Sequence, residues 1–147
     1  MRPILLKGHE RPITDIRYNR DGDLLFSCAK DKLITVWYTD NGERLGTYNG
    51  HKGAVQCLDI NWTTTRLLTA SMDMTVKLWD VQSGRELCEW VHRVPMRSCA
   101  FAAGDRKFLC VGDNVFGNPP TIFVYQLPET LINSSRPSTS AKPNMTP

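Results

Sequence analysis

Short stretches of alternating apolar and polar residues recur along the first two thirds of the chain. In 34–38, for example, Ile and Val alternate with Thr and Trp, which is the period-two pattern of a strand packed on both faces. Glycine-ending turns at 19–22, 40–42 and 82–84 separate such stretches, because glycine readily takes the positive φ that hairpin turns need. The pattern predicts two groups of four short strands: 13–18, 24–29, 34–38 and 44–48, then 55–60, 66–70, 75–80 and 85–91.

The two groups repeat one another with a step of 42 residues. The recurring pairs are Gly8-His9 and Gly50-His51, Ser27 and Thr69, Asp31 and Asp73, and Trp37 and Trp79. A period of roughly 40–45 residues that opens with Gly-His and closes with Trp-Asp is the signature of a WD40 propeller blade. The second repeat closes with Trp79-Asp80, whereas the first has Trp37-Tyr38. The chain therefore resembles the WD40 family, and we expect an all-β fold of WD40 β-propeller blades.

A third, degenerate repeat follows. It opens with Val91-His92 in place of Gly-His, and its closing pair is Tyr125-Gln126, after an extra loop at 117–120. Strands are expected near 96–101 and 108–112, and no fourth strand with the right alternation follows Leu127. The chain would thus hold about three of an expected seven blades, in an incomplete ring.

The repeats divide the chain into five segments. Residues 1–7 stand before Gly8-His9 as 44–48 stand before Gly50-His51, so they are predicted to be an outer strand that closes a ring by completing its last blade. The tail is rich in Pro, Ser and Thr and nearly without apolar residues, and it is predicted to be disordered. The segments are the ring-closing strand at 1–7, WD repeats at 8–49, 50–91 and 92–127, and the tail at 128–147.

Composition places the chain in the ordinary globular class. It has 147 residues, of which 41% are hydrophobic and 22% charged, and a net charge of +3 favours neither a nucleic acid nor a membrane as partner. Only three consecutive apolar residues precede Lys7, too few for a signal peptide, and no run approaches the roughly 20 needed to span a membrane. We expect a cytoplasmic protein whose five cysteines, with no C-x-x-C pair, are buried and reduced.

The recurring polar residues resemble the hydrogen-bonded tetrad of WD40 blades. A His can donate to the Asp and accept from the hydroxyl, while the hydroxyl accepts the indole N–H, so four polar groups satisfy one another. The same residue types also form hydrolase triads, but recurrence in consecutive repeats and the absence of a G-x-S-x-G elbow favour a structural role and no catalytic residue. The predicted structural tetrads are His9, Ser27, Asp31 and Trp37, and His51, Thr69, Asp73 and Trp79.

Ligand-binding motifs are missing from the sequence. His9, His51 and His92 stand in equivalent loops of separate repeats without a second ligand at zinc spacing, and no phosphate-binding glycine loop is present, so neither a metal nor another cofactor is expected. Four basic residues stand at the loops that enter each blade: Lys7, Arg11, Lys52 and Arg93. They form either a solvated rim or a rim that faces an acidic partner; direct contact with nucleic acid is not expected.

Several longer blocks carry a more specific resemblance. Residues 3–11, 18–26, 36–38 and 41–48 are similar to subunit i of eukaryotic translation initiation factor 3, and the likeness extends over about 1–127. The resemblance implies a non-catalytic, seven-bladed scaffold that binds subunits b and g during 43S pre-initiation complex assembly and scanning on 40S-bound complexes. It carries over the two tetrads but no partner-binding residues, since the family's contacts with subunit b fall largely on other blades.

Two further expectations follow from this resemblance. Related proteins are linked to the type II TGF-β receptor, so the alternative function is a receptor-associated WD40 signalling adaptor. Seven blades need roughly 300 residues, so the chain is expected to be a fragment, a splice form or a truncated gene model.

Overall fold

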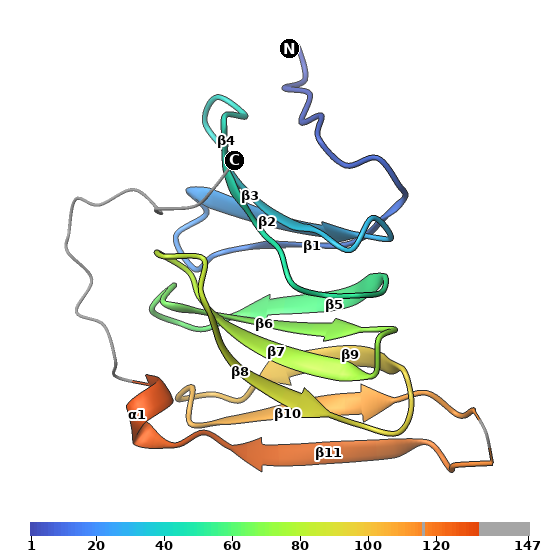
Figure 1. The fold of residues 1–147 in the computed structure, drawn as a ribbon. Coiled ribbons are helices and arrows are strands. Elements are labelled where there is room, and N and C mark those ends of the chain that lie inside the picture. Colours follow the sequence, from blue (N-terminus) through green and yellow to red (C-terminus); the bar gives the residue numbers. More distant parts are fainter. Residues whose placement is uncertain (116, 133–147) are drawn as a thin grey trace.

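The computed structural model describes residues 1–115 and 117–132, and within them the strands form three antiparallel sheets (Figure 1). Blade 1 has the order β1 (Ile13–Tyr18), β2 (Leu24–Ala29), β3 (Ile34–Tyr38) and β4 (Arg44–Tyr48). Blade 2 has the order β5 (Val55–Ile60), β6 (Arg66–Ser71), β7 (Thr75–Asp80) and β8 (Glu86–Val91). Blade 3 holds β9 (Met96–Phe101), β10 (Lys107–Gly112) and β11 (Thr121–Gln126).

The predicted all-β blade architecture is confirmed, with an open rather than closed arrangement of sheets. Strand boundaries in the first two blades agree with the predicted ones to within one residue. The turn glycines Gly22, Gly42 and Gly84 have φ of 74°, 72° and 75°, the left-handed conformation that the turn pattern required. Local turn chemistry and strand alternation were therefore sufficient to locate these eight strands.

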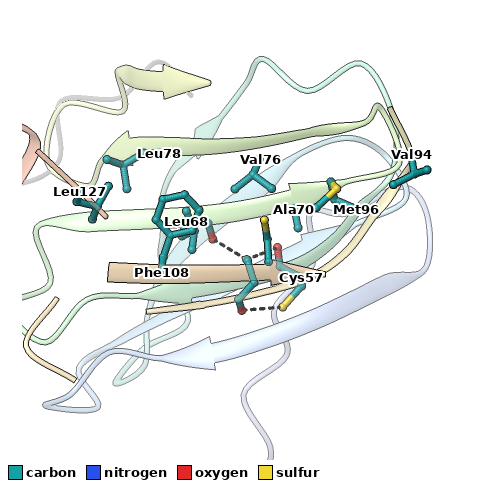
Figure 2. Close-up of a cluster of buried hydrophobic side chains, with 11 residues drawn as sticks. Cys57, Leu68, Ala70, Val76, Leu78, Val94, Met96, Phe108 and Leu127 are labelled. Carbon is teal, nitrogen blue, oxygen red and sulfur yellow. Dashed lines mark hydrogen bonds between the residues drawn. The ribbon is translucent and has the colours of Figure 1, made fainter. Parts of the chain in front are cut away.

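Two hydrophobic cores lie between the blades. One joins blade 1 to blade 2 and includes Phe26, Val36 and Leu58, which have no exposed surface. The other joins blade 2 to blade 3 around Leu68, Leu78 and Phe108 (Figure 2). A fully buried side chain of this size contributes about 1.5–3 kcal/mol. Stability therefore resides mainly in contacts between neighbouring blades.

Polar contacts reinforce the same interfaces. The Asp15 carboxylate of blade 1 accepts the Leu58 amide of blade 2 at 3.2 Å, and Asp59 of blade 2 accepts the Phe101 amide of blade 3 at 2.8 Å. The Tyr48 hydroxyl donates to the Val81 carbonyl at 2.9 Å. Each blade is thus fixed to the next by hydrogen bonds as well as by its apolar face.

The N-terminal segment differs from the blades. Residues 1–12 contain no strand, and the outer-strand role predicted for 1–7 has no partner strand among the described residues. Figure 1 shows this segment running beside blade 1. The space beside Gly42 is occupied by the side chains of Ile4 and Leu6, which a Cβ on that glycine would meet at 2.6 and 2.8 Å. Ring closure by this segment stays a prediction.

The start of the tail is ordered, so the sequence prediction of disorder from residue 128 is wrong for residues 129–132. A short helix, α1 (Glu129–Ile132), follows Pro128, and its Leu131 and Ile132 side chains pack against the core between blades 2 and 3. Arg66 Nε also donates to the Leu131 carbonyl at 2.6 Å. These contacts offset the entropy lost on ordering residues 129–132, which the prediction of disorder from composition had assumed nothing would offset. Residues 133–147 lie outside the described part of the chain.

Helix length also bears on membrane association. Among the described residues, no helix is long and apolar enough to cross a membrane.

Candidate functional site

In blade 1, the four recurring polar residues form one connected hydrogen-bond set. His9 Nδ1 lies 2.9 Å from Asp31 Oδ2, and His9 Nε2 lies 2.7 Å from Ser27 Oγ. Trp37 Nε1 donates to the same hydroxyl oxygen at 2.9 Å. With its proton on Nδ1, His9 donates to the carboxylate and accepts from the hydroxyl, so every group has a matching partner.

Blade 2 repeats this geometry with deeper burial. His51 lies 2.9 Å from Asp73 Oδ2 and 2.7 Å from Thr69 Oγ1, and Trp79 Nε1 donates to Thr69 Oγ1 at 2.9 Å. Asp73 also accepts the Lys52 amide at 2.9 Å and the Thr75 amide at 3.0 Å. Burial acts to raise the pKa of Asp73, but the hydrogen bonds from His51 and the other donors outweigh it and hold this pKa well below its usual value.

The position before each histidine has little room for a side chain, which explains the glycine there. A Cβ on Gly8 would lie 2.9 Å from Cη2 of Trp37, and a Cβ on Gly50 would lie 3.0 Å from Cη2 of Trp79. The contact at Gly8 is shorter than real Cβ atoms show and the one at Gly50 is tighter than most of them, and both would press on rigid buried rings. The Gly-His pair therefore lets the chain pass over the indole that completes the set.

The order Asp, His, hydroxyl in both sets matches that of a hydrolase triad, but the surroundings differ. Each hydroxyl oxygen already contacts a ring nitrogen and an indole N–H, and Ser27 and Thr69 are only 3% and 0% exposed. A substrate carbonyl cannot reach either oxygen in this arrangement, as nucleophilic attack requires. What the two sets can do is join the entry loop, the second and third strands and the turn between them.

Blade 3 carries a reduced set that the sequence reasoning did not assemble. His92 Nε2 lies 2.9 Å from the Tyr125 hydroxyl and 4.0 Å from Cys110 Sγ, while its buried Nδ1 has no hydrogen-bond partner in the described residues. Burial lowers the pKa of His92 and raises the pKa of Cys110 to about 11. The strand pairing places Cys110 and Tyr125 where Thr69 and Trp79 stand in blade 2, and of this correspondence only the closing Tyr125 could be seen in the sequence.

The entry loops carry the predicted basic rim. All four predicted residues, Lys7, Arg11, Lys52 and Arg93, are exposed. The hydrogen bond between His9 and Asp31 places the β2–β3 turn on the same side, which adds exposed Lys30 and Lys32. We call these six residues the basic face; it lies at the right-hand ends of the strands in Figure 1. None of its side chains forms an ion pair within 1–115 and 117–132.

Comparison with known families decides the assignment of the repeats. The family model described as "WD domain, G-beta repeat" matches residues 3–38 and 42–80, which together make up half of the chain. The chain belongs to the WD40 family. The WD40 match ends with β7 of blade 2, so the degenerate third blade is recognised by its structure rather than by this model.

More specific relatives share one name. The WD40 chain is 48% identical over 128 residues to "Eukaryotic translation initiation factor 3 subunit I" of Schizosaccharomyces pombe, covering 87% of this chain and 39% of that protein. It is 58% identical over 102 residues to the Caenorhabditis elegans protein of that name, covering 69% and 31%, and 51% identical over 117 residues to the Xenopus laevis one, covering 80% and 36%. The chain thus spans about a third of these relatives' length, from 31% to 39%.

A solved structure agrees with the WD40 assignment. The crystal structure of the RRP9 WD40 repeats is similar with a TM-score of 0.69 and 27% sequence identity, over 72% of this chain and 34% of that one. The likeness supports the identification of the three sheets as propeller blades.

No feature of the described WD40 blades has the geometry of a metal site. Within 1–115 and 117–132, no group of three or more His, Cys, Asp or Glu side chains could hold a metal ion. The five cysteines are free, and all except Cys88 are buried. The histidines lie in separate blades, each in its own set.

A groove of about 720 Å³ lies at the strand ends opposite the basic face. It is lined by the ends of the inner strands and the turns that follow them, at 18–20, 59–63 and 101–105. The Arg20 guanidinium lies 5.0 Å from the ring centre of Trp62, which is 65% exposed, and the Trp62 amide donates to Asp105 at 2.8 Å. The groove therefore crosses all three blades, and its Trp62–Asp105 bond joins the turns of blades 2 and 3.

Proposed function

We propose that this chain acts as part of a WD40 scaffold subunit of eukaryotic translation initiation factor 3. The observation that carries this proposal is 48–58% identity, over 69–87% of the chain, to the S. pombe, X. laevis and C. elegans proteins with that name. The proposed role is support of 43S pre-initiation complex assembly and mRNA scanning in the cytoplasm. Its proposed partners are subunits b and g of the factor and 40S-bound complexes.

The proposed role needs no catalytic chemistry. The hydroxyls of Ser27 and Thr69, which have the nearest likeness to nucleophiles, are buried and fully engaged with His and Trp. We propose that both tetrads are structural devices that hold the entry loops in place. A rigid sheet edge with ordered loops suits a scaffold, because it presents its side chains to a partner without an ordering cost.

We further propose that the basic face is the surface that meets an acidic partner. Its six exposed cations lie on one side of blades 1 to 3 and have no intramolecular ion pair among the described residues. Like charges gathered in this way raise the rate of association with an acidic surface and disfavour basic competitors. This favours an acidic protein segment as the partner.

The experiment is co-sedimentation of a tagged chain from cell extract on sucrose gradients. The expected result is recovery in 40S fractions together with subunits b and g. Recovery only in slow fractions, or together with receptor kinases, would overturn the translational proposal in favour of no shared role or of the receptor-associated adaptor.

A pair of charge reversals tests the basic face within the same assay. Lys30→Glu combined with Lys52→Glu is expected to reduce recovery of the partners about tenfold. The matched control is Arg106→Glu combined with Lys107→Glu, which makes the same change of charge at exposed residues near the opposite strand ends. Equal losses from both pairs would show a general charge effect and sink the assignment of this face.

A further inference from the structure

The groove opposite the basic face lies across blade 2 and its contacts with both neighbouring blades, at the left-hand ends of the strands in Figure 1. Its walls come from the β1–β2, β5–β6 and β9–β10 turns and from the ends of the strands before them. Blade 2 supplies the central part, and apolar cores join this blade to blade 1 on one side and to blade 3 on the other. The shape of the groove is therefore set by contacts between blades that the structure describes.

Trp62 presents an exposed aromatic surface in this groove. It lies in the β5–β6 turn and is 65% exposed, whereas Trp37 and Trp79 are 3% and 1% exposed. Its backbone amide donates to Asp105 Oδ2 at 2.8 Å, which fixes the turn. The Trp62 ring belongs to neither apolar core, so its position is held by the backbone while its surface stays available to a ligand.

The Trp62 ring already binds a cation from within the chain. The Arg20 guanidinium lies 5.0 Å from its centre, which is a cation–π distance. Asp21 neutralises this guanidinium, since its Oδ1 lies 2.9 Å from Arg20 Nε. Both side chains of this ion pair are well exposed, and an exposed pair contributes little to stability. A cationic ligand can therefore displace Arg20 from the ring at little cost.

Two carboxylates in the groove have no cation of their own. Asp59 and Asp105 both line it, and neither forms an ion pair within 1–115 and 117–132. Burial raises the pKa of Asp59, and repulsion from Asp105 adds to the increase, while backbone hydrogen bonds and Arg17 act in the opposite direction. The two negative charges are thus close enough to repel one another, and a ligand cation would relieve this repulsion.

We propose that the groove binds a basic, extended peptide segment of a partner protein. One arginine of the segment stacks on the Trp62 ring in place of Arg20, and a second basic side chain meets Asp59 and Asp105. Arginine suits both contacts, because its planar guanidinium stacks on aromatic rings and pairs with carboxylates. Residues 102–104, which are two alanines and a glycine, line the neighbouring wall and leave room for the peptide backbone.

The groove and the basic face differ in the sign of their charge. The basic face has six exposed cations without an ion pair in the described residues, whereas the groove has two carboxylates without one. A basic segment is repelled by the first surface and attracted by the second, so the charge of a partner selects the face that it meets. This proposal does not rest on the translational role and can fail or hold separately from it.

The test is binding of a fluorescein-labelled peptide of alternating arginine and proline, followed by fluorescence anisotropy. Proline keeps the peptide extended. The expected result is saturable binding to the unchanged chain that weakens as salt is added. No binding of this peptide would overturn the proposal. Equal binding of a labelled peptide with serine in place of arginine would also overturn it, because a cation would then not be required.

Removal of the two carboxylate charges tests where the peptide binds. Asp59→Asn combined with Asp105→Asn keeps an oxygen acceptor for the backbone amides that these side chains bind, and is expected to weaken binding at least about tenfold. The matched control is Asp40→Asn combined with Glu43→Gln, which makes the same change of charge at exposed residues of the β3–β4 turn, outside the groove. Its affinity is expected to stay within about twofold. Equal weakening by both pairs would contradict binding in the groove.

Two changes at the ring have effects of opposite sign. Arg20→Gln removes the competing cation and is expected to tighten binding about two- to fivefold, whereas Trp62→Ala removes the stacking surface and is expected to weaken it by a similar factor. Loss of structure would not tighten binding, and circular dichroism checks that all variants are folded. Weaker binding by Arg20→Gln, or unchanged binding by Trp62→Ala, would contradict stacking on this ring.

Discussion

The three strands of blade 3 follow the order of the first three strands of blade 2, but the two blades differ in how their polar groups are satisfied. In blade 2, His51 lies between Asp73 and Thr69, and each nitrogen of its ring has a partner. In blade 3, the equivalent His92 reaches the Tyr125 hydroxyl with one nitrogen, and the other is buried without a partner in the described residues. A blade sheet therefore forms with a complete set in blade 2 and with a reduced one in blade 3.

The difference shows which interactions specify a blade and which only strengthen it. Blade 3 keeps its three strands because Phe108, Cys110 and Met96 pack into the core that it shares with blade 2. Its loss of the acid and the hydroxyl coincides with a longer loop before β11, and blade 3 has three strands within residues 1–115 and 117–132. Apolar packing is sufficient for the sheet, whereas the complete tetrad fixes the loops and turns at its end.

The largest effect should come from removal of the acid in blade 2. Asp73→Ala leaves the fully buried His51 side chain and two backbone amides without their acceptor, which should cost about 3–5 kcal/mol of unfolding free energy. Urea denaturation measures the change. The control is Asp113→Ala, which breaks an ion pair with exposed Arg97 and should cost at most about 1 kcal/mol. Similar costs for the two changes would contradict a special role for the tetrad.

The next largest loss of stability should come from placing a cysteine in blade 2 at the position that Cys110 holds in blade 3. Thr69→Cys replaces a buried hydroxyl that bonds His51 and Trp79 by a weak acceptor, at an expected cost of about 1–3 kcal/mol by urea denaturation. The reverse exchange, Cys110→Ser, should change stability by less than about 1 kcal/mol, because Tyr125 already bonds His92. A larger effect in blade 3 than in blade 2 would reverse the comparison.

A smaller loss is expected for Tyr125→Phe. The change removes one partly buried hydrogen bond to His92 but keeps the ring, which stacks on Phe108 with centroids 5.1 Å apart. We expect a cost of about 0.5–1.5 kcal/mol in thermal or urea unfolding. A cost as large as that of Asp73→Ala would mean that the reduced set is as important to blade 3 as the complete set is to blade 2.

The smallest effect is a difference in pH dependence. Burial lowers the pKa of His92, so the folded state binds fewer protons than the unfolded state, and the stability from neutral His92 is present above about pH 6.5 and lost as pH falls through its folded pKa. The lowered pKa of Asp73 acts only below about pH 4. Between pH 7.5 and 5.5, the unchanged chain should lose more stability than His92→Gln. Equal losses in urea titrations at the two pH values would show that His92 does not titrate on unfolding.

The sequence contained most of what was needed for the first two blades. Alternation and glycine turns located their strands, and the 42-residue step paired the members of both tetrads, since these signals are local or repeated. Two features depend on contacts between distant residues and had no local signal. The first is the burial of Arg66, which bonds Asp80 and the Leu131 carbonyl of α1, 65 residues further along the chain. The second is the order of α1 itself, which this bond to Leu131 supports in a segment expected to be disordered.

The reduced set of blade 3 could be predicted from the sequence only in part. Its histidine was visible as Val91-His92, but the altered spacing and the replacement of the hydroxyl by Cys110 concealed its partners. The basic face was incomplete for a similar reason. Lys30 and Lys32 follow β2 rather than a Gly-His pair, and only the His9–Asp31 bond shows that their turn lies beside the entry loops.

Hydrogen exchange tests most directly the claim that tetrads strengthen blades already formed by apolar packing. The measurement is mass-spectrometric exchange of backbone amides in the unchanged chain. The account predicts that amides of β6 and β7 exchange at least about tenfold more slowly than those of β10 and β11, since local opening is easiest where fewer interactions hold the strands. Equal protection of the two blades, or slower exchange in blade 3, would contradict it.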